Sequence, residues 1–256
     1  MTEAVLFEHP LSEKVRLFLR FEQLINNFHE ACKDSSRWHT YSAVNALIDL
    51  HELTSRIDMR ADIVREIERI SNNLEKLETV EKVNQDRLST VVHKLQSETV
   101  RLLNGRGPLD SHLKSHELFN ALKQRRPKRG GINLFDLPQL NHWLSQPADT
   151  RMALLRSWIG PYDEIYRSIN LLLNLTRESG KKISTTASQG FYEQVLDQGA
   201  SHQLIRLWLP SVNHNYPDIS SGKHRISIRF MHLDNMADRP KQISEDQDFE
   251  LMICVL

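Results

Sequence analysis

The sequence predicts an α+β fold: a mainly helical domain with an antiparallel helix hairpin, plus a smaller, mostly antiparallel β-sheet domain. Two observations carry this prediction. Up to residue 179, apolar residues recur mostly three and four positions apart, which is the spacing of a helix face. Beyond Gly180 they alternate with a period of two, as in strands. The expected domains span residues 9–179 and 180–256, and a strand at residues 4–8 joins the second domain.

The N-terminal stretch contains both patterns. Residues 5–7 are apolar and strand-like, and Pro10 ends the run because proline cannot donate to a sheet ladder. A helix follows, with Ser12 as its N-cap and Glu13 in its first turn. Its apolar stripe consists of Leu11, Val15, Phe18, Phe21, Ile25 and Phe28.

The next three helices include a hairpin. A well-buried helix is expected at 38–55. Heptad-like helices at 59–77 and 88–102, with a polar break at Asn84 and Gln85, favour an antiparallel hairpin. Its apolar seam is interpreted as intramolecular core, and a contact with a second subunit is the alternative.

Shorter elements complete the helical domain. The Asn-Gly-Arg-Gly-Pro run at 104–108 ends the hairpin, because glycine suits a helix C-terminus and proline cannot continue the helix. Residues 132–135 are a candidate sheet strand that interrupts the domain. The remaining helices are expected at 109–123, 137–144, 148–158 and 162–179.

The C-terminal part is expected to be a set of strands. The β-branched and aromatic residues predict strands at 204–209, 225–231 and 249–256, and a weaker strand at 183–193. The connections between them are too short for crossover helices, which favours antiparallel pairing. Loops are expected at 197–199, 210–222 and 234–248.

Composition restricts the class of protein. The 33 basic and 33 acidic residues give a formal charge of zero, which argues against binding nucleic acid through bulk charge. No apolar run approaches the ~20 residues of a membrane span, and the first residues do not resemble a signal peptide. We therefore expect a cytoplasmic protein without membrane insertion. In that compartment Cys32 and Cys254 are expected to stay reduced.

A search for catalytic patterns finds none. His112 and His116 are the only histidines four residues apart, which is metal-ligand spacing on a helix, but no nearby acid or cysteine completes a site. Surface histidines are the simpler interpretation. The chain also lacks a serine-hydrolase elbow and a phosphate-binding glycine loop. We therefore predict no enzyme activity, no catalytic residue, no metal and no cofactor.

Charge is unevenly placed along the chain. Residues 101–131 carry eight basic and two acidic residues, a net charge of +6, whereas residues 234–250 carry −4. These runs are either solvated loops or a basic groove for a carboxylate-bearing partner. An accessory role on nucleic acid, using the basic loop 125–129, is an alternative function. That loop lacks the interleaved exposed aromatic residues that support base stacking.

Four stretches in order along the chain resemble the ZapD (YacF) family of bacterial cell-division proteins. The first is the N-terminal run VLFEHPLSEKVRLFLRFE. The others are FDLP with the following HWL at 142–144, Tyr-Pro at 216–217 with Ile219, and RISIRFM at 225–231 with DFEL at 248–251. The resemblance covers nearly the whole chain and contains no catalytic signature.

The resemblance implies a function and a binding site. ZapD-like proteins are expected to form symmetric homodimers that bind the C-terminal tail of FtsZ, bundle its protofilaments and act at the mid-cell division ring. Lys114 and Asn141 stand where relatives are expected to carry arginine and histidine, so His142 is taken in place of Asn141. The tail-binding residues implied in this chain are Arg20, Arg56, Arg60, Lys114, His142, Arg225 and Arg229.

Overall fold

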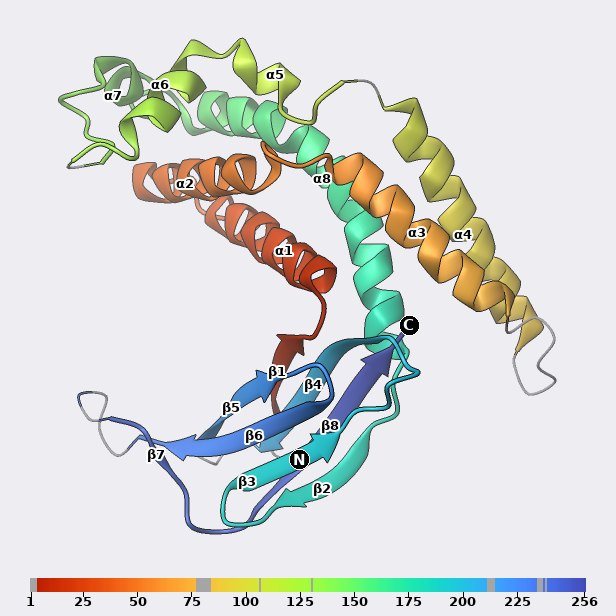
Figure 1. Ribbon diagram of the computed structural model, residues 1–256. Helices are drawn as coiled ribbons and strands as arrows, with labels where there is room; N and C mark the ends of the chain where they lie inside the picture. Colours follow the sequence, from red (N-terminus) through yellow and green to blue (C-terminus); the bar gives the residue numbers. More distant parts are fainter. Residues whose placement is uncertain are drawn as a thin grey trace. The chain divides into compact units, whose positions relative to one another are not determined.

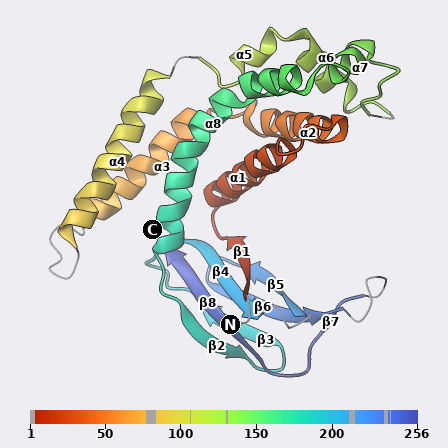
Figure 2. The same cartoon turned by 180° about the vertical axis from the view of Figure 1, so that it is seen from behind.

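The computed structural model describes residues 4–76, 84–105, 107–129, 131–210, 215–233, 237 and 239–256. The chain forms two compact units, one made of Met1–Leu19 with Leu173–Leu256 and the other of Arg20–Leu172. The first unit is built mainly of strands and the second of helices (Figure 1, Figure 2). The predicted α+β class is confirmed.

The first sheet of the β unit contains the N-terminal strand. Its order is β1 (Ala4–Pro10), β4 (His202–Pro210), β8 (Gln247–Val255) and β2 (Ile183–Ala187), and every pair is antiparallel. The pairing of β1 with β4 confirms that the N-terminal strand completes the sheet. The strand extends to Pro10 because β1 lies at the edge, where a missing N–H need not face a partner.

The second sheet is also antiparallel. Its order is β3 (Phe191–Val195), β6 (Arg225–His232) and β5 (Asn215–Ser221), and the short β7 (Lys241–Gln242) pairs with β6. The prediction of a loop across 210–222 is therefore wrong. An edge position again explains the difference, because β5 tolerates Pro217 only where no further strand needs its N–H.

The expected strand at 183–193 is two strands, β2 and β3, in different sheets. They are joined by Gln189 and Gly190, which both have positive φ angles of 50° and 71°. Two consecutive residues with positive φ make a type I′-like turn, whose twist suits a tight connection between antiparallel strands. The turn passes the chain from one sheet to the other.

The core of the β unit lies between its two sheets. Alternation along the strands places one set of side chains inward, and on β6 it leaves Arg225 and Arg229 outward. The buried members of this core are Ala187, Leu196, Ile205, Leu207, Leu209, Ile226, Ile228, Phe230, Phe249 and Leu251.

The helical unit follows the predicted order with a few changes. Val15 N donates to Ser12 Oγ at 3.2 Å, which confirms Ser12 as the N-cap of the first helix. The first and last helices contribute residues to both units. The helices are α1 (Glu13–Ala31), α2 (Arg37–Thr54), α3 (Met59–Glu75), α4 (Gln85–Asn104), α5 (Ser111–Lys114), α6 (Glu117–Arg125), α7 (Pro138–Leu144) and α8 (Ala148–Glu178).

Helices α3 and α4 form the predicted antiparallel hairpin (Figure 1). Arg101 anchors it to α8 by donating to the Glu164 carbonyl at 2.8 Å and to Ser168 Oγ at 2.7 Å. The predicted seam residue Leu77 lies outside the described residues. The buried seam contains Ile63, Ile67, Ile70, Leu88, Leu95 and Leu102.

Two helix predictions are wrong. The helix expected at 109–123 is divided into α5 and α6 at Ser115 and His116. The helices expected at 148–158 and 162–179 are one helix, α8, with Pro161 inside it. Proline in a helix interior costs roughly 3 kcal/mol. Trp158 and Tyr162, which precede and follow the proline in the sequence, are fully buried, and this burial offsets the cost.

The prediction of a strand at 132–135 is also wrong, because these residues form a turn. Gly131 has a positive φ angle of 67°, and Leu137 N donates to the Asn133 carbonyl at 3.1 Å. These features close the chain into a turn before α7, so its backbone groups do not extend into a sheet.

Candidate functional site

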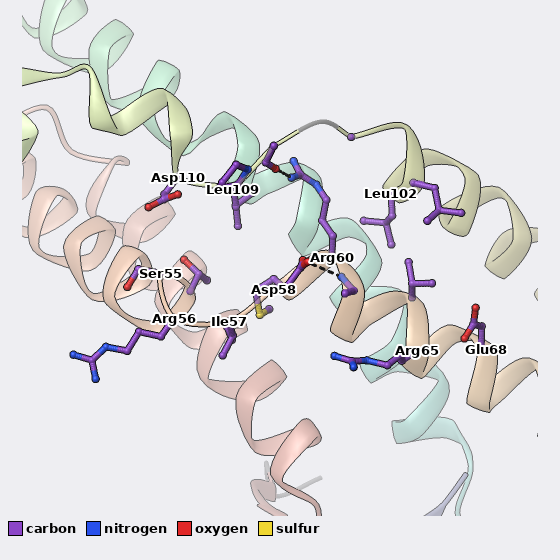
Figure 3. A pocket seen from close by; sticks show the side chains of 18 residues that line it. Ser55, Arg56, Ile57, Asp58, Arg60, Arg65, Glu68, Leu102, Leu109 and Asp110 are labelled. Atoms are coloured by element: carbon purple, nitrogen blue, oxygen red, sulfur yellow. Dashed lines mark hydrogen bonds between the residues drawn. The ribbon is translucent and has the colours of Figure 1, made fainter.

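A groove of about 800 Å³ opens on the helical unit where α2 ends, α3 begins and α4 gives way to the following loop (Figure 3). It contains two of the residues implied by the resemblance, Arg56 and Arg60. Its walls mix guanidinium groups with aliphatic side chains such as Ile57, Val64 and Leu103. Such walls can contact both a carboxylate and an apolar side chain.

The turn between α2 and α3 sets one wall of the groove. Ser55 N donates to the His51 carbonyl at the end of α2, and Asp58 Oδ1 accepts from Ala61 N at 3.1 Å as the N-cap of α3. Between these two caps, Arg56 and Ile57 are exposed. The turn therefore presents a cation and an aliphatic side chain next to each other at the rim.

Arg60 crosses the groove from the first turn of α3. Its Nη1 donates to the Gly107 carbonyl in the loop after α4, and the guanidinium packs against Gly105. The acceptor is a neutral carbonyl and not a carboxylate, so this bond brings no negative charge to offset that of Arg60. This bond also holds the loop to α3.

Arg56 extends outward from the rim (Figure 3). Within the part of the chain that the structure describes, no acidic side chain pairs with it. Arg65, one turn beyond Arg60, is paired with Asp62 at 2.7 Å. Arg56 is therefore the groove's most available cation for an incoming carboxylate.

Lys114 is connected to the groove by an ion pair with Asp110. The Lys114 Nζ lies 3.4 Å from Asp110 Oδ1, and Asp110, which is nearly buried, lines the groove (Figure 3). On its other side Asp110 Oδ2 lies 3.7 Å from Nδ1 of the buried His51. Burial, and then the positive charge of Lys123, lower the pKa of His51. Asp110 thus links a surface lysine to a histidine whose pKa is lowered by burial.

The other implied residues of the helical unit do not line this groove. Arg20 is exposed on α1 and donates to Gln23 Oε1 at 3.1 Å. His142 is exposed on α7, with its Nε2 3.3 Å from Gln146 Nε2. The structure therefore places Arg56 and Arg60 in one groove and Lys114 beside Asp110 of its lining. Arg20 and His142 lie outside the groove lining.

Arg225 and Arg229 belong to the β unit. Both project from the outer face of β6, and Arg225 Nη1 lies 3.6 Å from Glu193 Oε2. Arg229 is opposite Asp218 in the pairing of β6 with β5. They form a basic pair on one strand face, as their spacing of four residues predicts.

Sequence reasoning missed the aliphatic part of the groove. Leu103 and Ile57 are exposed there, and Gly107 supplies the carbonyl that holds Arg60. The glycine-rich run at 104–108 was the available signal, but it indicated only the end of a helix. Which side chains gather beside it depends on how α3 and α4 pack, and no local pattern encodes that.

The two histidines of the 112/116 pair do not lie as metal ligands on one helix face would. His112 is on α5 and His116 precedes α6, so the two imidazoles do not share a helix face. His112 Nε2 lies 2.8 Å from the Trp158 carbonyl, and the His116 ring packs against the Trp158 ring. Across the described ranges, no group of three or more potential metal ligands is placed to hold an ion.

Comparison of the sequence with known proteins identifies its family. The family model described as "ZapD: Cell division protein" matches residues 19–229. The chain belongs to the ZapD family. Its ZapD relatives include "Cell division protein ZapD" of Methylococcus capsulatus, 32% identical over 257 residues that cover 100% of both chains. The corresponding protein of Cronobacter sakazakii is 34% identical over 257 residues, which cover 99% of this chain and 100% of that protein.

Membership in ZapD assigns the chain a role in cell division. The family is one of cell-division proteins and not a known enzyme family. A third relative, from Bordetella petrii, is 31% identical over 250 residues that cover 98% of this chain and 99% of that protein. Among the helices that the structure describes, none has both the length and the apolar character needed to cross a bilayer.

Proposed function

We propose that the protein binds the C-terminal tail of FtsZ through the groove lined by Arg56 and Arg60, the arginine groove. We further propose that it acts as a homodimer that bundles FtsZ protofilaments at the mid-cell ring. The observation that carries the proposal is the groove itself: Arg56 and Arg60 share one 800 Å³ groove, and no carboxylate is paired with either among the described residues. Guanidinium groups of this kind hold carboxylates in bidentate geometry. The proposed mechanism is mechanical and non-catalytic.

A dimer would explain bundling by valency. Two equivalent grooves in one symmetric dimer grip two filaments, and repetition along each filament turns a weak contact into firm attachment through effective concentration. Variants that sedimentation shows to be monomeric should still bind an isolated tail peptide but should fail to bundle filaments in light scattering. Bundling by monomers would contradict this mechanism.

Charge reversal tests the assigned residues. Arg56→Glu should weaken binding of a labelled FtsZ tail peptide by about fivefold to tenfold, because a cation at the rim becomes a repelling anion. Arg225→Glu tests whether the outer face of β6 contributes. Arg16→Glu is a control on an exposed arginine outside the proposed site. Binding should also weaken with added salt. Salt-independent binding, unaffected by both reversals, would place the tail elsewhere.

A second candidate function rests on one observation around the loop 125–129. Trp38 is 72% exposed and Phe135 is 82% exposed, and Tyr41 joins the two regions by stacking on Trp38 and donating to the Ile132 carbonyl at 3.3 Å. The loop 125–129 itself contains no interleaved aromatic residue, and these rings belong to other segments of the chain. Aromatic rings beside cations favour single-stranded nucleic acid.

The available charge of that loop is small. Arg125 pairs with Asp136 and Arg126 with Asp49, which leaves Lys128 and Arg129 as its exposed cations. Binding of a single-stranded oligonucleotide should be measured against salt, with Trp38→Ala and Phe135→Ala as variants. Affinity that depends steeply on salt and falls in both variants would support this second function. Absence of binding would eliminate it.

A further inference from the structure

The arginine groove contains aliphatic side chains that no described part of the chain covers. Leu103 is 68% exposed and Ile57 is 37% exposed, and both line the groove with the half-buried Val64 and Leu109. Single exposed aliphatic residues are common on protein surfaces, but here Leu103 and Ile57 both lie on the wall of one groove. The groove therefore offers an apolar contact in addition to its charges.

The charges beside these side chains favour a carboxylate. Arg56 has no acidic partner among the described residues, and Arg60 bonds a carbonyl. Two of the three acids that line the groove are engaged, since Asp58 caps α3 and Asp110 is nearly buried beside Lys114. The third, Glu68, lies about two helical turns along α3 from Arg60. The α2–α3 end of the groove is thus complementary to negative charge, and its aliphatic wall is next to that charge.

We propose that Leu103 and Ile57 determine specificity by holding a bulky aliphatic or aromatic side chain of the bound segment next to a carboxylate that Arg56 holds. This inference rests on the proposed function, because it states which feature of the FtsZ tail the groove reads. A segment with acidic residues alone would leave the aliphatic wall in water. Such a segment would bind weakly, and in proportion to its charge only.

Leu103→Ser tests the apolar contact, with Val100→Ser as the matched control. Val100 lies on the same helix, is 61% exposed and is not among the residues that line the groove. The measurement is anisotropy of a labelled FtsZ tail peptide with the full-length protein, repeated over a range of salt concentrations. Leu103→Ser should weaken binding about tenfold or more, with an unchanged salt slope, because burial of a leucine side chain is lost and no charge changes. Leu103→Met should retain most of the affinity.

A coupled substitution in the peptide makes the test specific. Each bulky apolar residue of the tail peptide should be replaced by alanine in turn. At one position the change should weaken binding to the native protein but have much less effect on Leu103→Ser, because the two side chains share one contact. Independent, additive effects would overturn the inference.

Different results would overturn the apolar contact at Leu103 and the tail-binding function. If Leu103→Ser and Val100→Ser bind like the native protein while Arg56→Gln binds weakly, the apolar contact is overturned and the tail-binding function stands. If the native protein does not bind the peptide, both are overturned. Circular dichroism should show native folding of Leu103→Ser, whose exposed position predicts little loss of stability.

Discussion

The guanidinium of Arg60 packs directly on Gly105: a β-carbon at Gly105 would lie 2.8 Å from Arg60 Nε. Gly105 has a φ angle of −68° and a ψ angle of 126°, which any residue adopts. The glycine is therefore needed here for space and not for backbone conformation. Its role is to let Arg60 reach the Gly107 carbonyl across the groove.

Gly105→Ala should consequently act through Arg60. The new methyl group should displace the flexible guanidinium from the Gly107 carbonyl, while the free energy of unfolding changes by less than about 1 kcal/mol. If the tail binds in the groove, its affinity should fall about as far as in Arg60→Ala. The double variant should be no weaker than Arg60→Ala alone, because both changes remove the same interaction. Additive losses in peptide-binding titrations would contradict this relationship.

Gly190→Ala should destabilise the protein by at least about 2 kcal/mol, since a side chain in the left-handed region costs roughly 1–2 kcal/mol before any contact is counted. Gly190 has a φ angle of 71°, and an added β-carbon would lie 2.7 Å from the Ile243 carbonyl oxygen. Gly199 has no such restriction, since the nearest atom to its β-carbon would be Asp197 Oδ1 at 3.6 Å. Gly199→Ala is therefore the control in denaturant unfolding, and equal stability of the two variants would be the contrary result.

These positions show what sequence patterns can and cannot predict. The period-two stretch containing Ile226, Ile228 and Phe230 predicted a strand, and that strand is β6. Pro217 concealed β5, because proline argues against a strand unless the strand is known to lie at a sheet edge. Pro161 similarly argued for two helices, since the tertiary packing that keeps α8 continuous is not visible in local spacing.

The candidate site was predictable only in part. The resemblance supplied Arg56 and Arg60, and the structure places them in one groove. Leu103 was not predicted, because an apolar residue at the end of a heptad-like helix is ordinarily part of the seam. It is exposed instead because the seam of α4 ends with Leu102, the neighbouring residue, which is buried.

Glu8→Gln should lower the free energy of unfolding by about 1–2 kcal/mol. The Glu8 carboxylate lies 2.8 Å from Arg177 Nη2 and 2.9 Å from Arg206 Nε, and all three side chains are largely shielded from water. Loss of its charge leaves two guanidinium groups without their carboxylate, which costs more than loss of a surface ion pair.

The matched control for this change is Glu13→Gln. Glu13 lies 3.5 Å from Arg16, but its side chain is almost fully exposed, so solvent screens the pair. Urea unfolding should show a clear loss of stability for Glu8→Gln and almost none for Glu13→Gln. Similar small losses in both would show that burial adds nothing to the Glu8 contacts.

His51 should make the protein less stable in mild acid. Burial first, and then the neighbouring Lys123, lower its pKa in the folded chain below the ordinary value of about 6.5. Below that pH the unfolded chain binds a proton that the folded chain resists, so stability falls as the pH decreases from about 6.5 through the folded pKa. Above about pH 6.5 the ring is mostly neutral in both states, so its protonation no longer lowers the stability. Unfolding free energies measured between pH 7.5 and 5.5 should show this decline.

His51→Gln separates this contribution from that of other groups. The variant removes the titrating ring between Asp110 and Lys123, so its unfolding free energy should depend less on pH over the same interval. It should not abolish the dependence, because burial and then Arg16 also lower the pKa of His9. His93→Gln, at an exposed position on α4, is the control for the substitution itself. An unchanged profile in His51→Gln would show that His51 binds its proton equally in the folded and the unfolded chain, as it would if Asp110 compensated for the charge in the folded state. That result would contradict the assigned origin of the acid sensitivity.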